Sequence, residues 1–266
     1  MTAIQAPALH TSTYRLTFLH QLRSELIKLV TVRGTWWSVI IAAVLTIGMA
    51  FAIAATMTGP GDAIMAVVAP VQFTMMLAGI LGVISVTGEY STGMIRSTLT
   101  AAPVRGMVLA AKSVVLGGFM FIVSLLISFA AAIGITPLIA ANDMTLDWAD
   151  PSKVITPILA VAGAMALFAL LGVGLGFVLR SGAGAIAVTV GILFVLPIIV
   201  SLFGMFGPGA QWIVDLGDYL PSAAVQSAVM PSDDWGISVP AAWATLVAWP
   251  AAALLGAWAV LRGRDA

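Results

Sequence analysis

Few side chains in this sequence have the types and spacing that chemistry requires. There is no cysteine, and the two histidines, His10 and His20, both precede the first long apolar run. The sequence therefore offers no thiol nucleophile and no histidine–glutamate zinc motif. None of the three lysines (Lys28, Lys112 and Lys153) follows a glycine, so there is no Walker loop to bind ATP. We therefore expect no enzymatic activity, cofactor site or metal site in this chain.

The composition excludes a soluble protein. Of the 266 residues, 61% are hydrophobic and only 8% are charged, and the mean hydropathy is +1.10. An ordinary soluble domain is about 45–50% apolar with glycine included, and about 25% charged. A polar surface for a globule of this size needs more charges than these, so we predict an integral membrane protein.

Six stretches without charges are each longer than the ~20 residues that a helix needs to cross a bilayer. They are continuously apolar rather than alternating, which excludes the strands of a membrane barrel. We predict an all-α integral membrane protein with six transmembrane helices. Their predicted ranges are 36–58, 63–87, 107–136, 156–179, 183–206 and 240–261.

The charges between these spans predict the orientation of the chain. Ten of the eleven basic residues fall on the side of the N-terminus, and only Lys153 falls on the other side, together with eight of the eleven acidic residues. Because Lys and Arg collect on the cytoplasmic side, both termini are predicted to be cytoplasmic. The predicted organisation is a cytoplasmic N-terminal segment over 1–35, a transmembrane domain over 36–261, and a cytoplasmic tail over 262–266.

The N-terminal segment has the pattern of an amphipathic helix over residues 13–33. One face is predicted to be apolar and to lie on the inner membrane surface, while Arg15, Arg23 and Lys28 reach lipid phosphates. The residues of the predicted apolar face are Phe18, Leu22, Leu26 and Leu29. Such a helix can be a simple topology anchor, or an elbow that packs beside a partner subunit.

Two of the segments between spans have further local signals. In the predicted cytoplasmic loop 88–106, Ser91 or Thr92 can cap a short helix that Pro103 ends. Its apolar edge would dock a partner, or the loop is an ordinary connector. The predicted external segment 207–239 contains aromatic residues of the kind that favour the membrane interface. It is predicted to hold a short helix or a re-entrant element, with a solvated loop as the alternative.

The predicted spans contain no ionisable residue deep inside them. Carriers driven by protons or sodium commonly place such groups near the bilayer midplane, so an ion-coupled carrier or channel is disfavoured. The pattern Gly172-Val-Gly174-Leu-Gly176 lies inside an apolar helix without a preceding strand, so it is not a nucleotide-binding loop. With Gly79 and Gly82, these glycines predict close helix packing instead.

The loop sequence resembles a known family. Residues 88–105 read Gly-Glu-Tyr-x-x-Gly-x-Ile-Arg-x-Thr-Leu-x-x-x-Pro-x-Arg, which is similar to the loop after the second helix of ABC-2 type transporter permeases. The segments Glu25-Leu-Ile-Lys-Leu29 and Tyr219-Leu-Pro-Ser222 resemble other parts of that family. The resemblance implies that the loop 88–106 meets a separate ATPase subunit. The residues that it places at or near this contact are Glu89, Gly93, Arg96, Pro103 and Arg105.

The resemblance also implies a function and partners. The chain is expected to be the permease subunit of a bacterial ATP-binding-cassette exporter, in the cytoplasmic membrane. ATP and Mg²⁺ would bind to the separate ATPase, and the permease would form a homodimer or a heterodimer with a homologous chain. No nucleic-acid partner is expected. The alternative is a membrane scaffold or assembly factor that associates with an ATPase but transports nothing.

Overall fold

The computed structural model describes residues 17–58, 63–101, 104–232 and 236–263, and the regular elements within them are helices. Six helical segments of the described chain are long and apolar enough to cross a membrane, as predicted. These are α2 (Arg33–Thr56), α3 with α4 (Ile64–Val68 and Val71–Ser91), α6 (Arg105–Ala140), α7 (Ile155–Leu179), the segment Gly182–Phe206, and α12 (Val239–Gly263). The protein is therefore an all-α, multi-pass membrane protein.

The remaining elements are short. The shorter helices are α1 (Phe18–Thr31), α5 (Met94–Ala101), α10 (Gln211–Gly217) and α11 (Pro221–Val229). The segment Gly182–Phe206 consists of α8 (Gly182–Val190), the π-helix η1 (Gly191–Val195), α9 (Leu196–Phe203) and the 3-10 turn η2 (Gly204–Phe206), with η3 (Pro208–Ala210) following. Pro197, at the start of α9, has no N–H to donate, which accounts for the irregular turn beside it.

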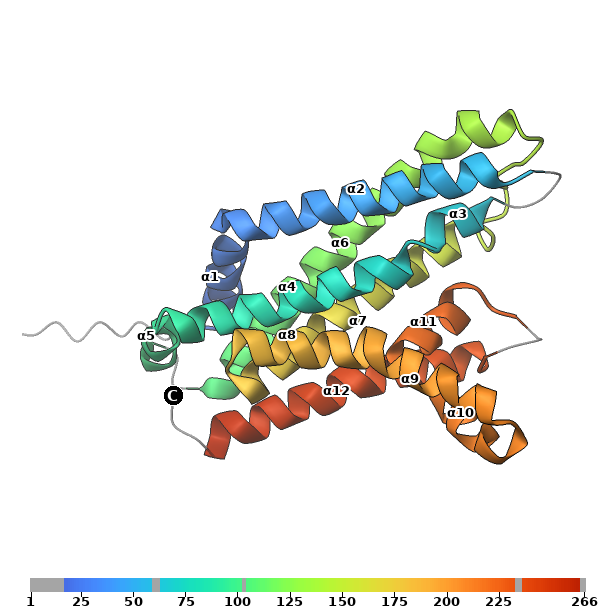
Figure 1. Ribbon diagram of the computed structural model, residues 1–266. Coiled ribbons are helices and arrows are strands. Elements are labelled where there is room, and N and C mark those ends of the chain that lie inside the picture. Colours follow the sequence, from blue (N-terminus) through green and yellow to red (C-terminus); the bar gives the residue numbers. More distant parts are fainter. Residues whose placement is uncertain (1–16, 59–62, 102–103, 233–235, 264–266) are drawn as a thin grey trace, which may run out of the picture.

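The long helices run side by side, and the short ones gather at the two ends of the bundle (Figure 1). Helices α1 and α5, the start of α6 and the end of α12 lie at one end. Helices α10 and α11 and the start of α12 lie at the other end. Helix α1 runs across its end of the bundle and joins α2 through a sharp bend after Thr31 (Figure 1). We call the end that contains α5 the α5 end, and the end that contains α10 the α10 end.

Helix α7 is the centre of the packing, and glycines bring it against α4. A Cβ atom at Gly82 would overlap the carbonyl oxygen of Ala169, and one at Gly172 would overlap the carbonyl oxygen of Gly79. The two backbones are therefore in direct contact along this line, as the glycine pattern predicts. Any side chain larger than hydrogen would force the two helices apart.

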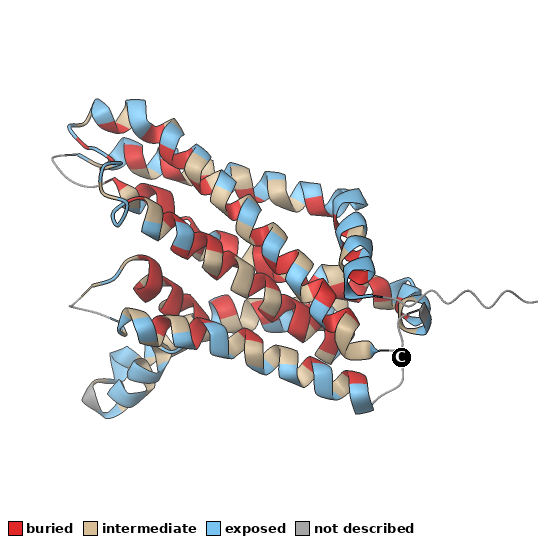
Figure 2. Ribbon diagram, turned by 180° about the vertical axis from the view of Figure 1, so that it is seen from behind, coloured by how far each residue is buried: buried red, intermediate tan, exposed pale blue. Residues whose placement is uncertain are grey.

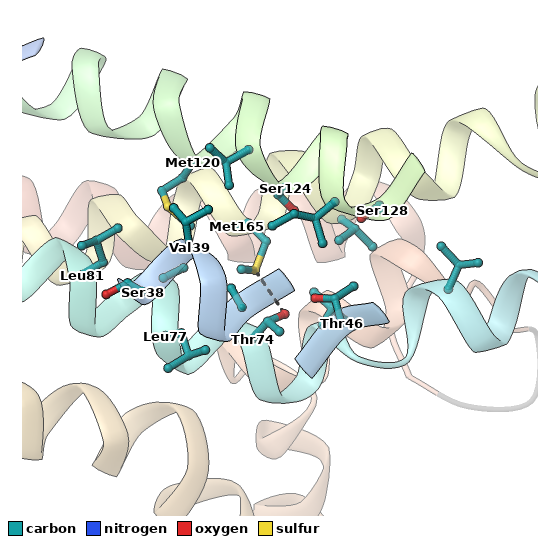
Figure 3. A pocket seen from close by; sticks show the side chains of 17 residues that line it. Ser38, Val39, Thr46, Thr74, Leu77, Leu81, Met120, Ser124, Ser128 and Met165 are labelled. Atoms are coloured by element: carbon teal, nitrogen blue, oxygen red, sulfur yellow. Dashed lines mark hydrogen bonds between the residues drawn. The ribbon is translucent and has the colours of Figure 1, made fainter. Parts of the chain in front are cut away.

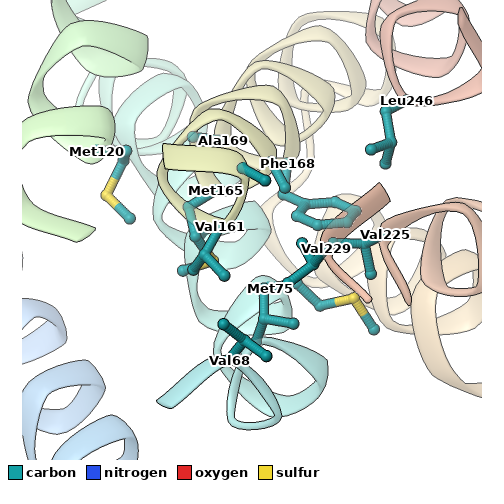
Figure 4. Close-up of a cluster of buried hydrophobic side chains, with 14 of the residues drawn as sticks. Val68, Met75, Met120, Val161, Met165, Phe168, Ala169, Val225, Val229 and Leu246 are labelled. Atoms are coloured by element: carbon teal, nitrogen blue, oxygen red, sulfur yellow. The ribbon is translucent and has the colours of Figure 1, made fainter. Parts of the chain in front are cut away.

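Apolar side chains fill the remaining space around α7. Phe168 and Met75 are almost fully buried and pack with Val225 and Val229 of α11 and Leu246 of α12 (Figure 4). Buried residues concentrate where the helices face one another, and exposed residues cover the outside of the bundle (Figure 2). Large apolar side chains on that outer surface include Val44, Ile122 and Leu255, as expected for a surface in contact with lipid.

The structure refines one local prediction from the sequence and contradicts another. The buried face of α1 contains Gln21, Glu25 and Leu29, whereas Phe18 and Leu26 of the predicted apolar face are exposed. The reason is electrostatic, because Glu25 has charged partners inside the bundle.

The contradicted prediction concerns the start of α5. The hydroxyls of Ser91 and Thr92 donate hydrogen bonds to the carbonyl oxygen of Gly88, at 3.0 and 2.8 Å. They therefore satisfy the end of α4 rather than cap α5. The chain turns between the two helices at Gly93, whose φ of 72° is accessible mainly to glycine.

Candidate functional site

Four charged side chains from three helices form one cluster at the α5 end. The Lys112 ammonium of α6 donates to Glu25 Oε2 of α1 at 2.6 Å and to Glu89 Oε1 of α4 at 2.9 Å. The Lys28 ammonium of α1 donates to the same two carboxylates, to Glu25 Oε1 at 2.8 Å and to Glu89 Oε1 at 3.0 Å. Two positive and two negative charges therefore balance within a single network.

The cluster is buried although it is charged. Glu25, Glu89 and Lys112 are each less than 5% exposed, and only Lys28 retains substantial contact with the surface. A buried charge is tolerated only when it is paired and hydrogen-bonded. The network pairs each of these charges across helices, although Glu89 Oε2 is buried without a hydrogen-bond partner among the described residues. It joins α1 to α4 and α6, so it fixes α1 against the end of the bundle.

For Glu25 and Lys28 of α1, pairing outweighs the cost of burial. Burial alone raises the pKa of the Glu25 carboxyl, but the charge of Lys112 and the hydrogen bonds from Lys112 and Lys28 outweigh it and hold this pKa below its usual 4.5. Burial lowers the pKa of Lys28, but Glu25 and Glu89 outweigh it and raise this pKa above its usual 10.5. Glu25 and Lys28 are therefore both charged at neutral pH.

These shifts predict how the attachment of α1 depends on pH. The contribution of Glu25 is complete above pH 4.5 and is lost as the pH falls through its lower folded pKa. The contribution of Lys28 is complete below pH 10.5 and is lost as the pH rises through its higher folded pKa. We therefore expect α1 to stay attached between about pH 5 and 10 and to loosen outside this window.

A spin label measures this attachment. The chain contains no cysteine, so Leu19→Cys gives one labelling position, on a side chain of α1 that is 73% exposed. The label should become more mobile in acid, and Glu25→Gln should remove the acid transition. A change in mobility between pH 5 and 10 in the parent chain would contradict the prediction.

Helix α5 lies beside the cluster and exposes one face. Ile95 is buried against the bundle and Leu99 packs on the core, whereas Met94, Arg96 and Thr100 are exposed. The chain on both sides of α5 is fixed: Glu89 belongs to the cluster, and Arg105 Nη1 donates to the carbonyl oxygen of Leu261, in α12, at 2.7 Å. The loop is thus a short exposed helix held between two anchored points.

The structure separates the five residues predicted for a partner contact. Arg96 points to the surface, and Gly93 forms the turn that begins α5. Glu89 is buried in the charge cluster, and Arg105 is half-buried against α12, so both anchor the loop. Pro103 lies outside the described residues. A contact between these residues and a partner subunit stays a prediction.

A cavity of about 310 Å³ adjoins the cluster. Its polar end is formed by the four cluster residues, and its walls come from α1, α2, α4 and α6. The apolar residues of the wall include Leu29, Leu81, Ile84, Val115 and Leu116. The site therefore combines charged groups and a mostly apolar chamber at one end of the bundle.

A smaller pocket lies deeper between α2, α4, α6 and α7 (Figure 3). Its volume of about 20 Å³ holds roughly one water-sized group. The hydroxyls of Thr46, Ser124 and Ser128 line it and have no hydrogen-bond partner among the described residues, although all three residues are at least nine-tenths buried. Ser38 and Leu81 line both this pocket and the larger cavity, so the two are adjacent.

Sequence reasoning missed the cluster, although part of its signal was present. Glu25 and Lys28 are three residues apart, which is a recognisable helix pair, and Lys112 follows the start of α6 by two turns.

No group of three or more His, Cys, Asp or Glu side chains in the described part of the chain is arranged to hold a metal ion. Scans of this sequence against protein-family models and against curated proteins give no match.

Proposed function

We propose that this chain is the permease subunit of an ATP-driven exporter of the ABC-2 type, coupled to a separate ATPase. One observation carries the proposal: α5 is an exposed helix whose two flanks are anchored to the spans, through Glu89 on one side and Arg105 on the other. A force applied to the exposed face of α5 would therefore reach α1, α4, α6 and α12 together.

The proposed mechanism uses these anchors as the path of the force. The ATPase would dock on the exposed face of α5, around Arg96, and its closure on ATP would push α5 toward the bundle. Because Glu89 joins the charge cluster, the push would be passed to Lys112 of α6 and Lys28 of α1. The helices would then tilt as bodies between two states of the pathway, which is the general form of such transitions.

The proposal also includes the assembly of the chain and its orientation in the membrane. Two copies of the chain would form the pathway, as a homodimer or with a homologous chain, in a bacterial cytoplasmic membrane with both termini in the cytoplasm. Among the described residues, Arg and Lys lie at the α5 end apart from Lys153, as expected for the cytoplasmic side. Helix α1 would lie on the inner membrane surface, and α10 and α11 on the outer side. The hydroxyls of the deeper pocket would supply polar contacts within the span.

Copurification tests the coupling. The tagged chain is purified from its native host, a copurifying ATP-binding-cassette ATPase is identified by mass spectrometry, and the pair is reconstituted in liposomes. We expect Arg96→Ala to weaken the complex and its stimulated ATP hydrolysis by about tenfold, since a central Arg is a typical interface hot spot. Lys153→Ala is the matched control, because it removes one exposed positive charge at the opposite end.

The outcomes separate the proposal from its rivals. Equal complexes with the parent chain and with Arg96→Ala would remove α5 from the coupling role. Hydrolysis of ATP by the pure chain alone would overturn the division of labour between two subunits. A stable complex in which the permease never alters ATP hydrolysis would instead favour the scaffold.

A further inference from the structure

The lining of the larger cavity is charged at one end and apolar beyond it, which matches an amphiphilic ligand. One end carries the charged groups of the cluster, and the walls beyond it are apolar, with Leu81 and Ile84 from α4 and Val115 and Leu116 from α6. At Ser38 and Leu81 the cavity adjoins the deeper pocket, so its long direction leads from the α5 end into the spans. A ligand with a charged head and a hydrocarbon chain matches this order of surfaces.

The number of N–H donors that remain unused on the two lysines indicates which charge the head group of such a ligand carries. Lys112 uses its three N–H donors on Glu25, Glu89 and the carbonyl oxygen of Ser85. Lys28 makes only two such bonds, to Glu25 and Glu89, and its side chain is 26% exposed. Lys28 therefore has one donor left for an acceptor that enters the cavity.

The surroundings favour an anionic group over a cationic one. The cluster itself is electrically balanced, and the exposed side chains nearby on α1 and α2 include Arg23 and Arg33. Phosphate is an anion that an ammonium binds well as a point charge. Helix α1, which carries Lys28, crosses the end of the bundle and exposes the apolar side chains of Phe18, Leu19 and Leu26, as a helix at a membrane surface does.

We propose that this cavity is a binding site for one phospholipid molecule of the surrounding leaflet. The lipid phosphate accepts a hydrogen bond from Lys28 Nζ, and one acyl chain lies between α2 and α4 against Leu81 and Ile84. The lipid thereby separates the first span from the second at the α5 end. This inference requires only that the chain spans a bilayer, and it does not rest on coupling to an ATPase.

Photolabelling tests the site. The purified chain is mixed with phosphatidylglycerol that carries a diazirine near the end of one acyl chain, and the labelled peptides are mapped by mass spectrometry. Labels should concentrate on the cavity walls, within residues 32–38 and 81–88. Lys28→Gln should reduce labelling there by about tenfold, because a charge-assisted hydrogen bond is lost. Lys28→Arg should retain it, and Lys153→Gln is the matched control.

A second pair of variants keeps the test independent of the charge cluster. Ser38→Trp fills the cavity from α2 without touching the cluster and should abolish cavity labelling. Ser201→Trp, on the exposed surface of α9, should not. A diacylglycerol with the same diazirine chain should label the cavity only at the level of the Lys28→Gln variant. Labelling that is uniform over the lipid-facing surface, or that Lys28→Gln and Ser38→Trp leave unchanged, would overturn the site. Competition by excess inorganic phosphate as strong as competition by phosphatidylglycerol would reduce it to an anion site.

Discussion

Replacing Lys112 by methionine is expected to destabilise the protein by about 3–5 kcal/mol. Methionine preserves the length and most of the volume of the side chain but removes the ammonium that bonds Glu25 at 2.6 Å and Glu89 at 2.9 Å. Both carboxylates stay buried, and Lys28 alone cannot balance them. An unpaired buried charge is costly, whereas the intact network is neutral. Denaturant unfolding of the purified protein in detergent measures the difference.

Two further variants show whether the loss is electrostatic. Lys153→Met is the matched control, because it breaks an ion pair with Asp147 in which both side chains are largely exposed, and such pairs contribute at most about 1 kcal/mol. Glu25→Gln added to Lys112→Met restores one charge of each sign and should recover more than half of the lost stability. Equal losses for Lys112→Met and Lys153→Met would show that the cluster does not hold the helices together.

Gly172→Ala is expected to be nearly as damaging as the loss of Lys112, although it adds only one methyl group. The new Cβ would overlap the carbonyl oxygen of Gly79, which belongs to the backbone of α4 and cannot rotate away. The two helices must separate, and the overpacking should cost about 3 kcal/mol. Unfolding in detergent should show the loss, together with a lower yield of monodisperse protein.

Gly118→Ala is the matched control for this variant. Gly118 lies within α6, and a Cβ there would meet nothing within 4 Å. Alanine is a better helix former than glycine, so this change should be neutral or should stabilise the helix by up to about 1 kcal/mol. If Gly172→Ala behaved like Gly118→Ala, the direct backbone contact between α4 and α7 would be refuted.

Much of the fold could be predicted from the sequence because the bilayer imposes a simple rule on composition. Charges are excluded from the spans, so the charge-free stretches marked the six segments, with ends within about four residues of those observed. The glycines of α4 and α7 were also predicted to serve close packing, and the overlap at Gly82 and Gly172 confirms this.

The orientation of α1 could not be predicted in the same way. Its apolar spacing predicted which residues would lie on the membrane surface, but it did not indicate that Glu25 is buried in the bundle, where it pairs with Lys112, 87 positions further along the chain. Hydrophobic periodicity reports only on neighbours within one helix. A buried charge depends on a partner from another helix, so only the packed structure identifies it.

The candidate site, too, could be predicted only in part from the sequence. The sequence pointed to the loop 88–106 and to its short helix, since the charges and Pro103 interrupt the apolar pattern there. It did not indicate that Glu89 faces inward while Arg96 faces outward, because this depends on the turn at Gly93 and on how Ile95 packs. The hydroxyls of Thr46 and Ser124 are likewise inconspicuous in sequence, and they line the same pocket only because α2 packs against α6.

The two ways in which helices are joined at α4 differ in how they respond to displacement. Against α7, backbone meets backbone at Gly79 and Gly172, so a shift along the axis produces a collision. Against α1, the two ammonium groups of Lys28 and Lys112 share the same pair of carboxylates. A displacement of α1 breaks only the pairs Glu25–Lys112 and Lys28–Glu89, and each of the four charges keeps one partner, Glu25 with Lys28 and Glu89 with Lys112. Helix α1 is therefore held by ion pairs that can break and re-form, whereas α4 and α7 are fixed in one register by direct backbone contact.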